Sequence, residues 1–170
     1  KLVAVTRRNA AKAENYARRH GVPRWYDDAE KLISDPDVNA IYIATPPSSH
    51  AAYAIRCLEQ GKDVYLEKPL ALHMKDAGRI DAALARSGAK LSVAHYRRAQ
   101  PMFRKIRDLI SQGAIGAVRL VLLRMLQPPG SDIIASVEDN WRVDPSVSGG
   151  GLFHDLAPHQ LDLMQYFFGN

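Results

Sequence analysis

Short apolar runs alternate with longer amphipathic stretches through the first half of the chain. Ala40–Ala44 is the plainest run, because it has no polar alternation and is typical of a strand buried on both faces. The longer stretches repeat their apolar positions at helical spacing and end at glycines such as Gly21, Gly61 and Gly88. The pattern predicts strands at 2–6, 40–44, 64–66 and 90–94, a short segment around Trp25–Tyr26, and helices at 9–20, 28–34, 48–60 and 74–86. This alternation predicts an α/β fold, a parallel sheet with right-handed crossovers and helices on both faces.

The pattern changes near residues 96–100, where we expect a boundary between two lobes, 1–97 and 98–170. The second lobe is predicted to contain a helix from Pro101 to about Gln112, a long strand over Ala117–Leu126 and a final helix over Leu152–Phe168. Residues 127–150 are rich in proline, glycine and serine, which indicates a long loop that helps to select a ligand. One strand cannot form a sheet by itself, so this lobe is expected to be incomplete.

Composition narrows the class of protein without identifying it. Apolar residues make up 46% and charged residues 24% of the 170 positions, which is ordinary for a globular protein. No segment approaches the roughly 18 consecutive apolar residues of a membrane span. The net charge of +5 is spread along the chain, which argues against a nucleic-acid-binding stripe. The single cysteine, Cys57, excludes an internal disulfide and suggests a cytoplasmic setting.

The two ends of the sequence lead us to expect that it is a piece of a longer protein. No initiator methionine is present, and Lys1–Val5 already has the pattern of a strand. At the other end, the chain stops just after the predicted last helix.

Glu67-Lys68-Pro69 directly follows the predicted strand 64–66. Open α/β sheets bind ligands at the carboxyl ends of their strands, where a lysine can donate hydrogen bonds to a substrate oxygen. Pro69 restricts the backbone, and a cis bond there would direct Lys68 into a cleft. The alternative is a surface lysine in a turn.

Thr45-Pro46-Pro47-Ser48-Ser49-His50 also lies where a strand ends and a helix begins. Free N–H groups at a helix N-terminus suit an anion or a ribose hydroxyl, and Ser48 or Ser49 can cap the helix. The alternative is an ordinary capped loop.

On the last helix, Asp155, His159 and Asp162 follow the spacing i, i+4 and i+7, so they share one face. An Asp four residues before a His can orient the imidazole and raise its basicity, which suits a general base. A metal site from the three residues and a plain structural ion pair are the alternatives. His154 is expected to point elsewhere on the helix, where it would be exposed or capping rather than catalytic. The neighbouring buried stripe is predicted to contain Leu152, Leu156, Leu163 and Phe167.

Thr6-Arg7-Arg8 ends the first predicted strand. In dinucleotide-binding folds, an acidic residue after the second strand favours NAD, whereas an arginine accommodates the 2′-phosphate of NADP. Two arginines and no acid favour NADP over NAD, and two solvated surface arginines are the alternative.

Taken together, these motifs resemble the Gfo/Idh/MocA family of oxidoreductases. The resemblance extends across nearly the whole chain and includes Ile115-Gly116, Trp141-Arg142 and the run Gly149–Asp155 with His159 and Asp162. It implies a partial Rossmann domain over 1–97 and a partial substrate-binding and oligomerisation domain over 98–170. It also implies NADP or NAD as cofactor, a sugar, cyclitol or related polyol as substrate, and a homo-oligomer with no nucleic-acid or membrane partner.

The resemblance also implies a role for each candidate residue. Lys68 would bind the reacting oxygen, His159 would act as acid and base, and Asp155 would position the substrate or the base. Residues along the cofactor would be Thr6, Arg7, Arg8, Thr45, Pro46, His50, Glu67 and Lys68. Residues near the substrate would be Tyr96, Trp141, Arg142 and Asp155. The hypothesis is hydride transfer between a hydroxyl-bearing carbon and nicotinamide, with His159 taking the proton and Lys68 stabilising the alkoxide.

Two departures qualify this likeness. The family's first strand and its Gly-x-Gly-x-x-Gly turn would precede Lys1, so this chain alone is expected to bind a dinucleotide poorly or not at all. Pro158 interrupts the predicted last helix and could kink it or shift its start toward Ala157. A non-catalytic NAD(P)-binding regulator and an NAD-dependent glycosidase or lyase remain alternatives on the same fold.

Overall fold

The computed structural model of the protein describes residues 1–126 and 141–169. The predicted α/β alternation is confirmed, and all strand pairs are parallel. The strands are β1 (Ala4–Thr6), β2 (Arg24–Tyr26), β3 (Ala40–Ile43), β4 (Asp63–Leu66) and β5 (Leu91–Val93). The helices are α1 (Ala10–His20), α2 (Ala29–Ile33), α3 (His50–Glu59), α4 (Met74–Ser87), α5 (Pro101–Ser111), α6 (Pro145–Ser148) and α7 (Leu152–Phe168). Short 3-10 turns are η1 (Pro47–Ser49), η2 (Tyr96–Ala99) and η3 (Trp141–Val143).

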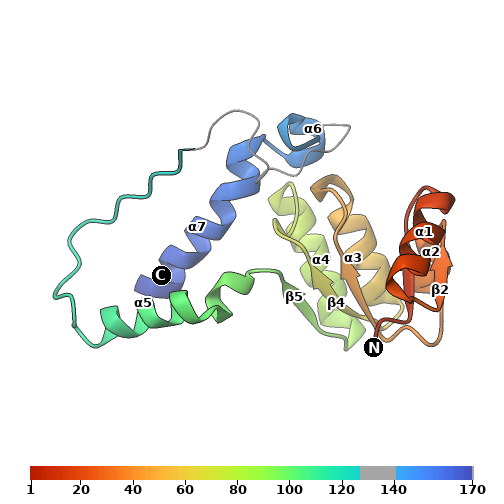
Figure 1. Ribbon diagram of the computed structural model, residues 1–170, viewed down its shortest axis with the longest axis horizontal. Helices are drawn as coiled ribbons and strands as arrows, with labels where there is room; N and C mark the ends of the chain where they lie inside the picture. Colours follow the sequence, from red (N-terminus) through yellow and green to blue (C-terminus); the bar gives the residue numbers. More distant parts are fainter. Residues whose placement is uncertain (127–140, 170) are drawn as a thin grey trace.

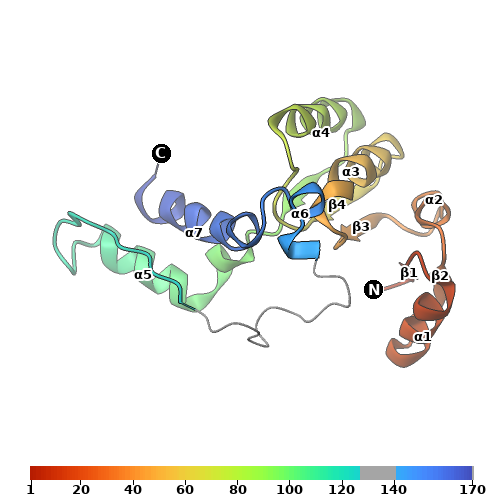
Figure 2. The same ribbon diagram turned by 90° about the horizontal axis from the view of Figure 1, so that it is seen from above.

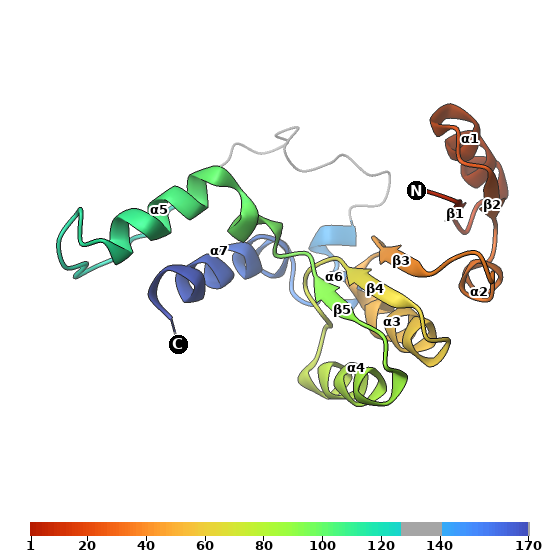
Figure 3. The ribbon, with the colours of Figure 1, turned by 90° about the horizontal axis from the view of Figure 1, so that it is seen from below.

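The strands form two separate sheets within the described residues. One sheet has the order β1-β2, and the other has the order β3-β4-β5. α1 packs on the β1-β2 pair, which lies at one end of the molecule (Figure 1). α3 and α4 lie together on one face of the three-stranded sheet (Figure 3).

The main core lies between this three-stranded sheet and its two helices. Alternation along β4 explains the packing, since Val64 and Leu66 are buried while Asp63 and Tyr65 face outward. The buried members of the core are Ile33, Ile43, Ala54, Cys57, Leu58, Val64, Leu66, Ile80 and Ala83. Carboxyl ends of β3 and β4 therefore project from a rigid, closely packed unit.

Local signals for the first helices operate largely as predicted. Asn9 accepts a hydrogen bond from the backbone N–H of Lys12 and caps α1, and Gly21 ends it in the left-handed region at φ 62°. α3 differs, because η1 precedes it and no side chain caps it. Ser49 instead forms a hydrogen bond with the hydroxyl of Thr45.

The predicted strand over Ala117–Leu126 is wrong for this structure. The segment has no assigned strand and pairs with no other described segment, and most of its residues are exposed. Its apolar composition matches a strand, but a strand also needs a ladder partner for its N–H and C=O groups. Of the predicted loop 127–150, residues 141–150 contain η3 and α6, and residues 127–140 lie outside the described residues.

The last helix, α7, begins at Leu152 and continues through Pro158. It packs against α5 and η2, beside the three-stranded sheet (Figure 2). Of the predicted apolar stripe, Leu163 is buried and Leu156 and Phe167 are half-buried. Among the described residues, no helix combines the length and the apolar character that crossing a membrane requires.

Candidate active site

Lys68 reaches the last helix in the structure and pairs there with Asp155. Nζ of Lys68 lies 2.6 Å from Oδ1 of Asp155 and 2.5 Å from the Asp155 carbonyl oxygen. Both side chains are largely covered, with 12% and 20% exposure. The Lys68–Pro69 peptide bond is cis. The ammonium after β4 and the carboxylate in the first turn of α7 thus form one ion pair between two segments 87 residues apart.

Arg142 forms the second cationic contact of this carboxylate. Its Nε lies 3.3 Å from Oδ2 of Asp155, and its guanidinium stacks over the Trp141 ring at 4.5 Å from the centroid. Nη1 of Arg142 is buried and has no hydrogen-bond partner among the described residues. Asp155 is therefore held between Lys68 and Arg142, which leaves one N–H-bearing atom of the arginine available to another group.

A cleft of about 150 Å³ surrounds this ion pair. It lies where the carboxyl ends of β3 and β4 face η3, α6 and the start of α7. Its lining residues are Ala44, Thr45, Pro47, Glu67, Lys68, Pro69, Trp141, Arg142, Ser148, His154 and Asp155. The predicted cofactor residues Thr45, Glu67 and Lys68 and the predicted substrate residues Trp141 and Arg142 meet here. His154 is exposed, as expected, and also lines the cleft.

His159 occupies a different environment from Lys68 and Asp155. It is only 5% exposed and is absent from the cleft lining. Its ring lies edge-on to Tyr96 at 5.3 Å between centroids, and its Nδ1 is buried without a partner among the described residues. Burial, together with the positive charge of Arg97 and Lys68, lowers the pKa of His159 to about 4. The imidazole is thus neutral at pH 7.

The third member of the predicted trio, Asp162, belongs to a separate ion pair. Its carboxylate accepts hydrogen bonds from Nε and Nη2 of Arg98 at 2.5–2.9 Å, and His95 Nδ1 lies 3.7 Å away. The shared helical face is correct, but its two carboxylates bind different cations. Within residues 1–126 and 141–169, no three His, Cys, Asp or Glu side chains are grouped as metal ligands.

His50 is fully buried and joins two loops of the first lobe. Its Nδ1 lies 2.7 Å from the carbonyl oxygen of Pro69, and its Nε2 lies 2.8 Å from that of Thr45. Neither ring nitrogen remains to contact a cofactor, contrary to the expected role along the cofactor. The contacts instead hold the loops after β3 and β4 at a fixed separation, which positions Thr45 and Lys68.

The remaining cofactor candidates lie at or after the carboxyl ends of β1, β3 and β4. Arg7 and Arg8 are exposed, and the Arg7 guanidinium stacks over Tyr16 at 5.2 Å from the centroid. Glu67 accepts a hydrogen bond from the Tyr42 hydroxyl at 2.6 Å. Partial burial and this bond to a carboxylate raise the pKa of Tyr42 to about 12. Pro46, the remaining cofactor candidate, is half-buried.

Sequence reasoning missed His95, Arg98 and Tyr42 as contributors to the site. His95 and Arg98 hold Asp162 beside His159, and Tyr42 holds Glu67 at the cleft. His95 lies two residues after β5, as Lys68 lies two residues after β4, so the rule that singled out Lys68 would also have found it. Nothing in the sequence pattern marks the Tyr42 contact, which depends on the β3-β4 register.

A parallel sheet with helices and a cleft at the carboxyl ends of its strands is typical of the Rossmann-type α/β class. Comparison with known proteins then identifies the family. Residues 1–95 match the oxidoreductase family with an NAD-binding Rossmann fold, and residues 103–170 match the Gfo/Idh/MocA C-terminal domain. The chain belongs to the Gfo/Idh/MocA oxidoreductase family.

Individual relatives agree with this assignment. Oxidoreductase P35 of Formosa agariphila is 49% identical over 168 residues, which are 99% of this chain and 52% of that protein. An oxidoreductase domain protein from Kribbella flavida is 34% identical, with a TM-score of 0.85 over 99% of this chain and 45% of that one. Levoglucosan dehydrogenase in complex with NADH and levoglucosan is 30% identical, with a TM-score of 0.81 over the same shares. The chain spans about half the length of the curated relatives that match it along its whole length.

Proposed function

We propose that this chain supplies the cofactor-facing and catalytic part of an NAD(P)-dependent dehydrogenase that acts on a hydroxyl-bearing carbon of a sugar, cyclitol or related polyol. The observation that carries the proposal is the Lys68–Asp155 ion pair, which lines the cleft at the carboxyl ends of β3 and β4. The similarity to levoglucosan dehydrogenase supports a sugar or polyol rather than another small molecule.

The described residues fit a dinucleotide along this edge of the sheets. Thr6 is the last residue of β1, and Arg7 and Arg8 follow it. Thr45 and Glu67 lie just after β3 and β4, so hydrogen-bonding groups and cations lie at the carboxyl ends of three strands. When bound, the cofactor exchanges a hydride with the substrate carbon. The two exposed arginines favour NADP, whose 2′-phosphate they can neutralise.

Lys68 is assigned to the reacting oxygen, because its ammonium donates hydrogen bonds and stabilises the alkoxide that develops as the proton leaves. Asp155 positions Lys68 through the 2.6 Å contact. His159 is assigned to proton transfer. It lies one turn along α7 from Asp155 and is neutral at pH 7, so its imidazole can accept a proton from a hydroxyl that reaches it.

Steady-state turnover of the complete protein tests this proposal. Levoglucosan and a panel of polyols are oxidised with NAD and with NADP, for wild type, Lys68→Met, His159→Asn and the exposed control Lys75→Met. Loss of Lys68 or His159 is expected to lower kcat by about 10²- to 10⁴-fold, with cofactor affinity largely kept. Lys75→Met is expected to behave as wild type. Wild-type turnover in Lys68→Met would refute the oxygen-binding role of Lys68. If the wild-type protein oxidised none of the polyols, the assignment as a dehydrogenase would be refuted.

A further inference from the structure

His154 differs from the other five histidines of the chain in its position. It is exposed, and it lines the same cleft as Lys68 and Asp155. The two buried histidines, His50 and His159, are absent from that lining. Within the described part of the chain, no hydrogen bond to either ring nitrogen of His154 is formed. The side chain therefore offers a free donor and a free acceptor to whatever occupies the cleft.

A glycine turn holds the His154 ring in place. Ser148 builds the turn, because its hydroxyl donates to the Asp144 carbonyl at 2.8 Å and accepts from the N–H of Gly151 at 3.0 Å. A Cβ on Gly150 would overlap the His154 imidazole, so the ring lies directly against the backbone. This close contact distinguishes His154 from a surface side chain that turns freely in solvent.

Several other polar groups of the cleft are already engaged with one another, although Nη1 of Arg142 has no partner among the described residues. The Lys68 ammonium and Arg142 Nε both contact the Asp155 carboxylate, and Glu67 accepts from Tyr42. A polyol that reaches Lys68 brings further hydroxyl groups into the cleft, and each loses water as it enters. An uncompensated hydroxyl costs free energy, so a free imidazole on the cleft wall stabilises such a substrate.

We propose that His154 is a substrate-contacting, specificity-determining residue that hydrogen-bonds a second hydroxyl of the substrate, beyond the one held by Lys68. This inference rests on the proposed function and narrows its substrate class to molecules with at least two hydroxyl groups. Substrates with two hydroxyl groups are preferred over mono-alcohols, because a mono-alcohol leaves the imidazole of His154 without a hydrogen-bond partner.

Chemical protection tests the contact without any turnover. Diethyl pyrocarbonate acylates accessible imidazole nitrogens, and mass spectrometry of the peptides measures the rate at each histidine of the complete protein. Saturating levoglucosan is expected to slow modification of His154 several-fold and to leave the exposed His20 and His73 unchanged. Equal rates at His154 with and without levoglucosan would overturn the proposal.

Kinetics of matched variants provides the second measurement. His154→Ala is expected to raise the KM for levoglucosan about 3- to 10-fold with kcat nearly kept, the effect of one lost neutral hydrogen bond. His154→Gln, which retains a donor and an acceptor, is expected to recover part of this loss, and His73→Gln is the control. An unchanged KM in His154→Ala would also overturn the proposal.

The two hypotheses fail in different ways. Lys68-dependent turnover with an unprotected His154 and an unchanged KM refutes only the role of His154. Absence of polyol oxidation by the wild-type protein refutes the proposed function, and wild-type turnover in Lys68→Met refutes the role of Lys68, whereas protection by levoglucosan still decides the contact of His154.

Discussion

Three histidines near the site show how strongly the environment decides the role of one residue type. His50 bridges two carbonyl oxygens in the core, His159 lies buried with an unpaired nitrogen, and His154 faces the cleft. His154 and His159 lie five residues apart on α7, which places them about 140° apart around the helix axis. The two imidazoles therefore face different surroundings.

The buried His159 predicts a pH dependence of stability. Its pKa is about 4 in the folded protein and near 6.5 when unfolded, so the unfolded chain binds the proton more tightly. The contribution of the neutral His159 to the free energy of unfolding is complete above pH 6.5 and is lost as the pH falls toward 4. At about 1.4 kcal/mol per pKa unit, the loss amounts to about 3 kcal/mol.

Urea unfolding of wild type, His159→Asn and the exposed control His20→Asn at several pH values measures this effect. The free energy of unfolding of His159→Asn is expected to fall less steeply between pH 6.5 and 4 than that of wild type. Parallel curves for wild type and His159→Asn would contradict the assigned pKa.

The sequence was sufficient to select Lys68, Thr45 and Glu67 as site residues. They follow predicted strands, and parallel strands bring their carboxyl ends to one edge of a sheet. The helical spacing correctly placed Asp155, His159 and Asp162 on one face. It could not show that Asp162 binds Arg98, since that contact depends on how η2 packs against α7.

At the scale of elements, β4 connects the core to the site. Leu66 is fully buried against α3 and α4, and the next two residues are Glu67 and Lys68. Packing of this strand therefore fixes where the ammonium emerges. Burial of Leu66 followed directly from its alternation with Tyr65.

Leu66→Ala is expected to lower the free energy of unfolding by about 2–5 kcal/mol, since it removes buried methyl groups and leaves a cavity. Ser92→Ala, at an exposed position of β5, is the control and is expected to change it by less than about 0.5 kcal/mol. Denaturant unfolding measures both. A loss for Leu66→Ala no larger than that of the control would show that the core does not depend on this side chain.

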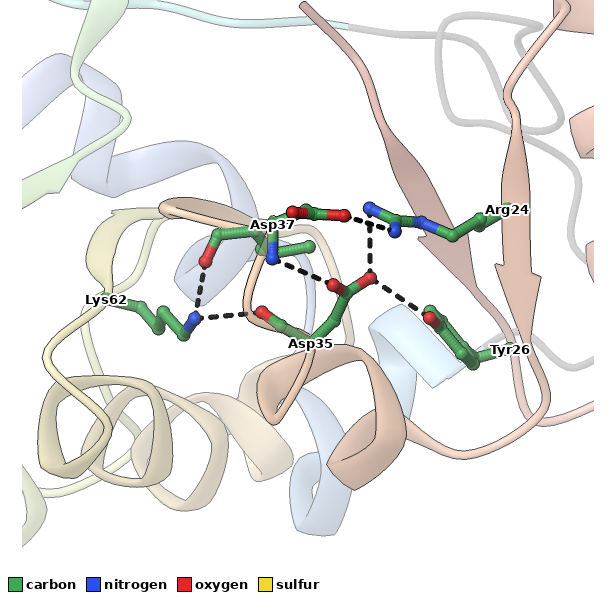
Figure 4. Close-up of polar contacts among 6 residues, drawn as sticks. Arg24, Tyr26, Asp35, Asp37 and Lys62 are labelled. Atoms are coloured by element: carbon green, nitrogen blue, oxygen red, sulfur yellow. Dashed lines mark hydrogen bonds and ion pairs between the residues drawn. The ribbon is translucent and has the colours of Figure 1, made fainter.

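At the scale of the whole molecule, a polar network connects the two sheets, which share no ladder in the described residues. The buried carboxylate of Asp35 accepts hydrogen bonds from Tyr26 at 3.0 Å and from the Asp37 N–H at 2.9 Å, and it pairs with Arg24 at 3.2 Å (Figure 4). Lys62, in the turn before β4, donates to the Asp35 carbonyl at 2.9 Å. These contacts, chiefly the backbone N–H of Asp37, lower the pKa of Asp35.

Asp35→Ala is expected to loosen the β1-β2 unit more than the three-stranded sheet, because it leaves Tyr26 and Arg24 without this partner. Hydrogen exchange is expected to accelerate in β1, α1 and β2 and to change little in β4. Asp37→Ala, which removes an exposed carboxylate from the same Arg24, is the control. Uniform acceleration across both sheets would contradict a local role for the network.

The amino-acid sequence by itself determined the order of strands and helices, the parallel sheet class and the candidates at strand ends, because these follow from local periodicity, caps and glycine stops. Tertiary structure alone decided which charges pair, that His50 lies in the core and that His154 lines the cleft. Such contacts join segments far apart in the chain, and their geometry depends on packing rather than on spacing. For the same reason the apolar stretch 117–126 has a strand's pattern without a strand's partner.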